Sequence, residues 1–353
     1  MSSGTSDSAA DGSRGDKSIE LEHLMVQQCN DLENMKQRTL VEKMEDFIYE
    51  QTSKVDQCVN VKHLCSVWGP TVDIMVRLML VSCFLDDSLG TMMHFPSHIK
   101  AVGGGILTTV ALGIGLLAQF IGSVCLLMLK YPDGAIKALI GWTIFQPILY
   151  GQILNLEFVA ESISLIGGLL MMRALLFCND AKTSRTQFFG RLLLPVMYIY
   201  YAGQFFFDAF TLDESSSVGM FISNLSLFVL NFLALIALLI SSMLVSVGLQ
   251  SRLVAFVLAI ANIAYVFYSH PFLLYIYFSD GEWKLRDMPM PNVVLPEGTT
   301  MSPDDLWKVY DLHKYYFFLG MSTSGALLIL TQFGPGDIAL QKDELILPTR
   351  AID

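Results

Sequence analysis

Residues 103–129 form the charge-free stretch GGGILTTVALGIGLLAQFIGSVCLLML. A helix needs about 20 mostly apolar residues to cross a hydrocarbon core about 30 Å thick. This stretch exceeds that length, and residues 217–247 do so as well without a single charge. Both segments therefore predict membrane-spanning helices.

The composition of the whole chain fits a membrane protein. Of its 353 residues, 53% are hydrophobic and only 16% are charged, and the mean hydropathy is +0.51. The net charge of -11, without clustered Lys and Arg, argues against nucleic acid as a partner. Six scattered cysteines without a C-x-x-C pair support neither a disulfide framework nor a zinc site. We expect neither a metal nor a cofactor.

Further apolar segments bring the predicted number of spans to eight. Residues 71–92 are the marginal one, because they carry Asp73, Arg77, Asp86 and Asp87. Counting them as a span places most loop Lys and Arg on one face, as expected for the cytoplasmic side. We therefore predict an all-α polytopic membrane helix bundle with both termini cytosolic; a re-entrant 71–92 would make seven spans. The other predicted spans are 138–156, 158–178, 191–210, 253–279 and 316–333.

The chain divides into a bundle and three flanking parts. Residues 1–20 are rich in Ser, Gly and Asp and predict a disordered tail, because few apolar groups offset the ordering entropy. Residues 21–66 predict a cytosolic amphipathic extension, with a mobile extension as the alternative for its first half. The helix bundle is predicted at 67–336, with a lumenal loop at 280–312 whose cations depart from the charge pattern. Residues 337–353 predict a cytosolic tail.

Charges inside a predicted span indicate an ion pair or a site. A charge at mid-bilayer costs about 2.5–3.5 kcal/mol on insertion scales, so such residues usually face the protein interior or a water-filled cavity. Asp73 and Arg77 are four residues apart and can pair on one helix face. We predict that they form a structural intramembrane ion pair.

Four further acidic residues predict a binding cavity. Asp86 and Asp87 lie in the first predicted span, and Glu157 and Glu161 lie at the start of the fourth. The functional interpretation is an acidic lumenal cavity for a positively charged ligand, such as a free amino terminus. The alternative, that the two aspartates only mark the interfacial end of the span, stays open.

Two histidines and a glycine pair have simpler interpretations. His94 and His98 in HFPSH have a spacing that suits a metal on a helix, but Pro96 disrupts helical geometry. We interpret them as interfacial loop histidines. Gly167 and Gly168 predict a close contact between helices.

The segment RLMLVSCFLDDSLG, residues 77–90, resembles the first membrane segment of the surfeit locus protein 4 family. The family pattern there is an arginine, an apolar run and then Phe-Leu-Glu-Asp-Gly. Asp86 replaces the glutamate, and Ser88 and Gly90 depart from the family's glycine and arginine. The residues that fit are Arg77, Phe84, Leu85 and Asp87.

Further stretches resemble the family in order. The match covers about residues 44–345, with an extended amino terminus and an enlarged loop at 280–310 as additions. The stretches are MEDF (44–47), SLIGGLL (164–170), GRLLL (190–194), GLQSRLVA (248–255), HKYYFFLGMS (313–322) and FGPGD (333–337). Their family-motif residues are Gly167, Gly168, Gly190, Arg191, Lys314, Tyr315, Gly334, Pro335 and Gly336.

The resemblance implies a multi-pass cargo receptor that cycles between the endoplasmic reticulum membrane and the Golgi. Such receptors bind soluble secretory proteins in the lumen, often by an amino-terminal peptide, and load them into COPII vesicles. The implied partners are cargo peptides, the COPII coat and membrane lipids. Asp86 and Asp87, helped by Glu157 and Glu161, would receive the cargo amino group. Relatives commonly end in a lysine-rich retrieval signal, whereas this chain ends DELILPTRAID, which puts return by the usual coat in doubt.

Two other functions are alternatives to the receptor. A small-solute or lipid transporter of the endomembrane system would use Arg77 and Asp86 as pathway residues. A membrane oxidoreductase subunit has only a loose likeness to DoxX-type proteins, and paired haem histidines are lacking. Because no nucleophile, base and orienting group occur together, we expect no enzymatic activity.

Overall fold

The computed structural model describes residues 61–177, 183–210, 218–279, 282–286 and 303–334, together with 336, 338 and 339. The described helices belong to one compact unit, Asn60–Asp353. These residues are almost entirely helical, which confirms the all-α class. The predicted tail at 1–20 and most of the predicted extension at 21–66 lie outside the described residues.

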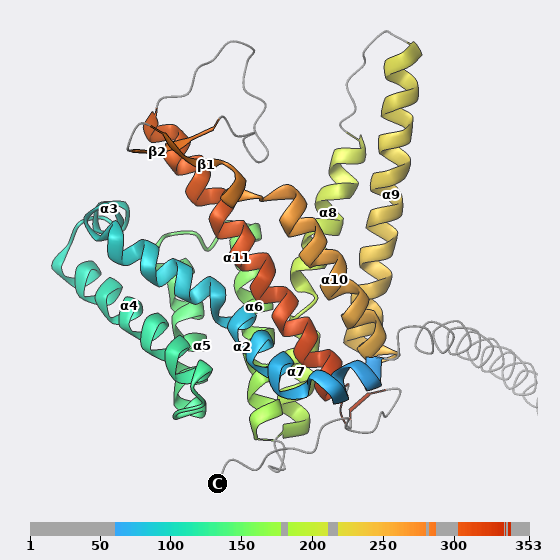
Figure 1. Cartoon of the computed structure of the whole chain (residues 1–353), viewed down its shortest axis with the longest axis horizontal. Helices are drawn as coiled ribbons and strands as arrows, with labels where there is room; N and C mark the ends of the chain where they lie inside the picture. Colours follow the sequence, from blue (N-terminus) through green and yellow to red (C-terminus); the bar gives the residue numbers. More distant parts are fainter. Residues whose placement is uncertain are drawn as a thin grey trace, which may run out of the picture. The chain divides into compact units, whose positions relative to one another are not determined.

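Ten described α-helices and one hairpin follow each other along the chain (Figure 1). A 3-10 turn, η1 (Phe272–Leu274), leads into the antiparallel strands β1 (Ile276–Ser279) and β2 (Glu282–Leu285), in which Ile276 pairs with Leu285. The helices are α2 (Val61–Met93), α3 (Phe95–Ala101), α4 (Ile106–Leu127), α5 (Pro132–Leu149), α6 (Leu156–Leu176), α7 (Thr183–Leu193), α8 (Val196–Phe210), α9 (Val218–Val247), α10 (Ser251–Ser269) and α11 (Pro303–Phe333).

The helices agree with a multi-pass membrane protein. Among the described residues, five segments are long and apolar enough to cross a membrane, and they lie in α4, α6, α9, α10 and α11. The other predicted spans overlap α2, α5 and the pair α7–α8. Every predicted span therefore corresponds to a helix or, for 191–210, to two helices separated at Leu194–Pro195.

Several predicted spans differ from the helices in their bounds. The span at 138–156 extends past α5, which ends at Leu149. The span at 253–279 is wrong at its end, because α10 stops at Ser269 and β1 occupies Ile276–Ser279. His270 caps α10 and is followed by Pro271, and the residue before a proline disfavours helical backbone. At the other side of the hairpin, α11 begins at Pro303, inside the predicted loop 280–312, because proline is well tolerated in the first turn of a helix.

Helix α11 is central to the bundle. It packs against α2, α6 and α10, while α4 packs with α5 and α8 packs with α9. Small residues allow the close approach: a Cβ on Gly325 would lie 2.8 Å from the Leu80 amide nitrogen, and one on Gly168 would lie 2.6 Å from the Ala326 Cβ. Such small residues drive helix packing in membranes. The fully buried core includes Leu80, Leu169, Met171, Met172, Leu319, Leu327 and Leu330.

Arginine side chains bind backbone carbonyls at the end of the bundle opposite α3. Arg191, only 1% exposed, donates to the Ser246 oxygen (3.2 Å) and the Ile338 oxygen (2.6 Å). Gln187 donates to the Gly334 oxygen at 2.8 Å. These bonds join α7 to α9 and to the segment that follows α11. The residues concerned include the family-motif residues Arg191 and Gly334.

Candidate functional site: an acidic cavity

The two adjacent aspartates of α2 point to different neighbours. Successive residues of a helix are separated by about 100° around its axis, so Asp86 and Asp87 cannot share a face. Asp87 faces α4 and α5, where its Oδ2 accepts from Gln119 Nε2 (2.5 Å) and Gln146 Nε2 (3.2 Å). Asp86 faces α11, where its Oδ1 lies 3.4 Å from Lys314 Nζ.

The first two turns of α6 carry the other two acids. Asn155 caps this helix, because its side chain accepts from the Phe158 amide. Glu157 and Glu161 follow one turn apart and therefore share a face. Glu157 accepts from the Tyr316 hydroxyl (3.1 Å), and Glu161 accepts from the Tyr315 hydroxyl (3.0 Å).

Glu161 is the most deeply buried of these carboxylates. Glu161 is only 3% exposed. Its Oε1 has no hydrogen-bond partner among the described residues. A buried carboxylate with an unsatisfied oxygen is costly unless a donor or a positive charge reaches it.

Three of the four predicted acids meet at one cavity of about 320 Å³. This volume is within the usual range of ligand pockets, about 300–1,000 Å³. Among the residues that the structure describes, no Lys or Arg lines the cavity. Its lining consists of Asp87, His98, Gln146, Tyr150, Gln152, Asn155, Glu157, Phe158, Glu161, Leu312, Tyr315 and Tyr316.

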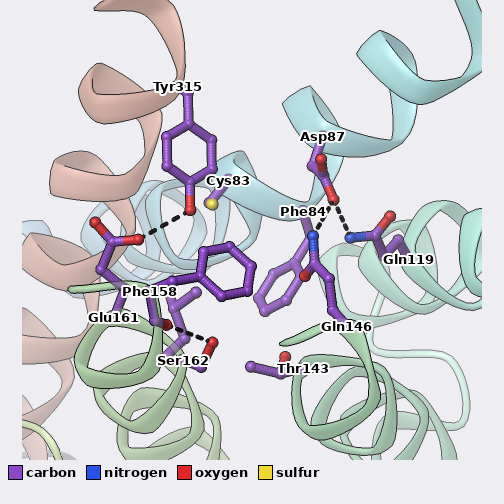
Figure 2. Close-up of a pocket in the computed structure, with 11 residues that line it drawn as sticks. Cys83, Phe84, Asp87, Gln119, Thr143, Gln146, Phe158, Glu161, Ser162 and Tyr315 are labelled. Carbon is purple, nitrogen blue, oxygen red and sulfur yellow. Dashed lines mark hydrogen bonds between the residues drawn. The ribbon is translucent and has the colours of Figure 1, made fainter. Parts of the chain in front are cut away.

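A small recess of about 20 Å³ shares part of this lining (Figure 2). In the close-up, Glu161 with Tyr315 lies on one side, Asp87 with its two glutamines lies on the other, and Phe158 lies between them. A water molecule needs about 10–15 Å³ of such volume, so the recess has room for little more than one water. A larger ligand is confined to the main cavity.

The donors that contact the three cavity acids are all neutral. Asp87 accepts hydrogen bonds from two side-chain amides, and each of the two glutamates accepts one from a tyrosine hydroxyl. Neutral donors orient the three acid groups but bring no positive charge to them, and hydrogen bonds to a charged donor are roughly twice as strong. The arrangement is therefore complementary to a small group that brings both a positive charge and N–H donors.

Asp86 is the predicted site residue that lies apart from the cavity. Its carboxylate is paired with Lys314 and does not line either space. The predicted pair Asp73–Arg77 has its ionic atoms 2.6 Å apart, and Arg77 Nη1 also donates to the Leu127 oxygen at 2.9 Å. Arg77 is ten residues from Asp87, about 15 Å along a helix at 1.5 Å per residue.

The family-motif residues are distributed over both ends of the bundle. Phe84 and Tyr315 line the recess, Leu85 packs against the core, and Lys314 contacts Asp86. A Cβ on Gly167 would lie 2.6 Å from the Leu194 amide nitrogen. Gly190, Arg191, Gly334 and Gly336 belong to the opposite end, and Pro335 lies outside the described residues.

Several lining residues were not identified from the sequence. Gln119 and Gln146 are lone amides within apolar helices, and that isolation is the signal that could have indicated them. His98 was interpreted as a loop residue, yet it lies in α3 and contacts the Tyr150 hydroxyl at 3.0 Å. Pro96 does not prevent this helix because it occupies the first turn, where proline is tolerated.

Comparison with known proteins gives one clear match. The sequence model of the SURF4 family matches residues 52–278, which is more than half of the chain and includes all four predicted acids. No solved structure matches the chain.

Proposed function

This chain belongs to the SURF4 family, and we propose that it is an endoplasmic reticulum cargo receptor. In this proposal it binds soluble secretory proteins in the lumen and loads them into COPII vesicles for transport to the Golgi. The observation that supports it most strongly is the acidic cavity, whose three carboxylates receive only neutral donors. Removal of a signal peptide gives each secretory protein a new free amino terminus, which has the complementary charge.

The charges at the two ends of the bundle support a lumenal cavity. The connections on the cavity side are α3, the α5–α6 turn and the α10–α11 hairpin. The other end carries Lys130, Lys137, Arg173 and Arg185, whereas α3 on the cavity side carries only Lys100. The hairpin and the start of α11, also on the cavity side, carry Lys284, Arg286 and Lys308 and depart from this pattern. Lys and Arg concentrate on the cytoplasmic side of membrane proteins, so the connections before α10 favour a lumenal cavity, and we propose that position.

The lining also suggests how a peptide would be held. An ammonium group has three N–H donors and no acceptor, which matches Asp87, Glu157 and the unsatisfied oxygen of Glu161. Tyr150 and Phe158 also line the cavity, and aromatic faces favour a cation and the apolar part of a side chain. Recognition would require an unblocked amino group and would tolerate several first residues.

Crosslinking followed by pull-down from intact cells tests the receptor. We expect the triple variant Asp87→Asn, Glu157→Gln, Glu161→Gln to recover secretory cargo at least about tenfold less than wild type, since tenfold corresponds to only 1.4 kcal/mol of binding. Asp133→Asn, at the opposite end of the bundle, is the matched control and should recover cargo normally.

The outcome separates the receptor from a transporter. Equal cargo recovery by wild type and the triple variant would refute the role of the cavity. If neither protein recovers lumenal cargo and solute flux depends on the three acids, a small-solute transporter is favoured instead. Glycosylation tags inserted at 95 and 290 test the membrane side separately, and both are expected to be modified in the lumen.

A further inference from the structure

The recess beside the acidic cavity has about the size of one ammonium group. Its volume of about 20 Å³ is little more than the roughly 10–15 Å³ that one water needs, and an ammonium group is about as large as a water molecule. Asp87 and Glu161 both line the recess (Figure 2). A group that fills this space therefore lies close to two carboxylates.

The recess offers acceptors rather than donors. The hydroxyls of Thr143 and Ser162 donate to backbone oxygens one turn earlier in their own helices, at 2.8 Å each, and the Tyr315 hydroxyl donates to Glu161 at 3.0 Å. Because a hydroxyl has a single N–H-like donor, its O–H, and two lone pairs, all three have only lone pairs left for a guest. A protonated primary amine has three N–H donors and no acceptor, so it matches this lining better than a hydroxyl group does.

Phe158 bounds the passage between the recess and the main cavity. Figure 2 shows its ring between the Asp87 side and the Glu161 side, and Phe158 lines both spaces. Glu157, one turn before Glu161 on α6, lines the main cavity but not the recess. A nitrogen at this passage would have Asp87 and Glu161 on the side of the recess. Glu157 would lie on the side of the cavity, together with the rest of the guest.

A methyl group on that nitrogen has no suitable place. N-methylation keeps the positive charge but replaces one N–H donor by an apolar group about as large as the ammonium group itself. Directed into the recess, the methyl group lacks space and faces acceptors to which it cannot donate. Directed into the cavity, it replaces the N–H that faces Glu157, whose described donor is then only the Tyr316 hydroxyl. An amino-terminal proline has the same defect, because its ring nitrogen is a secondary amine.

We propose that the recess selects primary amino termini, so that the receptor accepts cargo whose first residue is neither proline nor N-methylated. This inference rests on the proposed function, because it names the amino termini that the same site accepts. A site that hydrogen-bonds an N–H of its ligand rejects an analogue without it far more strongly than an apolar pocket rejects one added methylene. The selection therefore goes beyond the recognition of positive charge.

Peptide capture by the purified full-length protein tests the inference. The probes are lysine-free decapeptides with biotin at the carboxyl end and randomised second and third residues, and they begin with alanine, N-methylalanine or proline. We expect wild type to retain the alanine peptides at least about tenfold more than either of the other two sets. At pH 7.0 all three amines are largely protonated, so recognition by charge alone would retain them equally.

Two variants locate the selection at the passage. Phe158→Ala widens it and should reduce the preference for alanine over N-methylalanine at least about threefold; the cap of α6 uses the Phe158 backbone amide and is kept. The matched control Phe145→Ala removes an exposed ring of α5 that lines neither space and should leave the preference unchanged. Glu157→Gln should also reduce it, because the alanine peptide then loses the carboxylate contact that methylation removes.

Each outcome decides a different point. Equal retention of the alanine and N-methylalanine peptides by wild type overturns the inference and leaves the receptor function standing. A preference that neither Phe158→Ala nor Glu157→Gln reduces overturns it as well, since the selection then lies elsewhere. If wild type retains none of the three sets, the receptor function and the inference fail together.

A fourth probe separates the amino terminus from a lysine side chain, which also ends in a primary ammonium group. It is an N-acetylated decapeptide with one internal lysine, which would have to bring two arms of peptide chain to the cavity. We expect wild type to retain it no better than the N-acetylated peptide without lysine. Retention at the level of the alanine peptides would assign the site to lysine side chains and overturn the inference.

Discussion

Arg77 and Arg191, toward one end of the helix bundle, differ from Glu161, at the other end, in how their buried charged groups are satisfied. At the end opposite α3, Arg191 binds two backbone carbonyls, and Arg77 binds a carbonyl and an aspartate. At the cavity end, Glu161 accepts one hydrogen bond from a tyrosine hydroxyl, and its other oxygen has no hydrogen-bond partner among the described residues. Arg77 and Arg191 are satisfied by acceptors of the protein itself, whereas Glu161 of the cavity is only partly satisfied.

This difference distinguishes structural charges from candidate binding groups. A charge with all its bonds made inside the protein fixes the packing of helices and has nothing to offer a ligand. A charge held by neutral donors in an open space is oriented and still available. Intramembrane charge alone therefore does not indicate a binding site; the partners of each charged group must be known.

The largest expected effect is on the structural side. In Arg191→Met, the carbonyls of Ser246 and Ile338 lose a buried donor, and each unsatisfied group costs about 1–3 kcal/mol. We expect the free energy of unfolding to fall by about 2–4 kcal/mol, measured by thermal unfolding in detergent. Peptide capture per folded molecule should be unchanged. A stable variant with weakened capture would contradict the division between the two ends.

The contrast between the ends could be predicted only in part from the sequence. Charge-free stretches such as 103–129 predicted the helices, and the spacing of Asp73 and Arg77 predicted their pair, because both depend on local periodicity. The separation of Asp86 from Asp87 depends on α11 supplying Lys314 and on α4 and α5 supplying glutamines. Those partners come from 32 to more than 200 residues away, and no local pattern specifies them.

Glu161→Gln should have the largest effect at the cavity end. Its effect on the free energy of unfolding should be opposite in sign to that of Arg191→Met. The substitution removes a buried, partly unsatisfied carboxylate, so we expect the free energy of unfolding to rise by about 1–2 kcal/mol, in the range for poorly compensated buried polar groups. Peptide capture should fall about tenfold, or 1.4 kcal/mol, because the guest's ammonium group loses one of its three acidic acceptors. A gain in stability beside a loss of binding is expected because functional sites commonly cost stability. Paired unfolding and capture measurements check both effects, and a loss of stability would mean that Glu161 is structural.

Asp86→Asn sharpens the comparison within α2. Because Asp86 is paired with Lys314 at 3.4 Å and does not line the cavity, we expect capture to stay within about twofold of wild type. The loss of a partly exposed ion pair should cost less than about 1 kcal/mol. The matched variant Asp87→Asn, one residue further, should instead reduce capture strongly. Equal effects of the two substitutions would show that both aspartates contact the guest.

The smallest expected effect is the pH dependence of the surface cluster around Asp133. Hydrogen bonds from Lys137 and Arg173 lower the pKa of Asp133 below its ordinary value. A carboxyl whose pKa is lower in the folded state stabilises the protein above its unfolded pKa of about 3.9, and this stability is lost as the pH falls further. The side chain is 36% exposed, so after solvent screening we expect only a few tenths of a kcal/mol. The difference in unfolding temperature between wild type and Asp133→Asn should therefore be small at pH 6 and vanish toward pH 3. A difference that grows with acidification would contradict the ion pairing of Asp133 with Lys137 and Arg173, because a paired carboxylate can only lose stabilising energy when it is protonated.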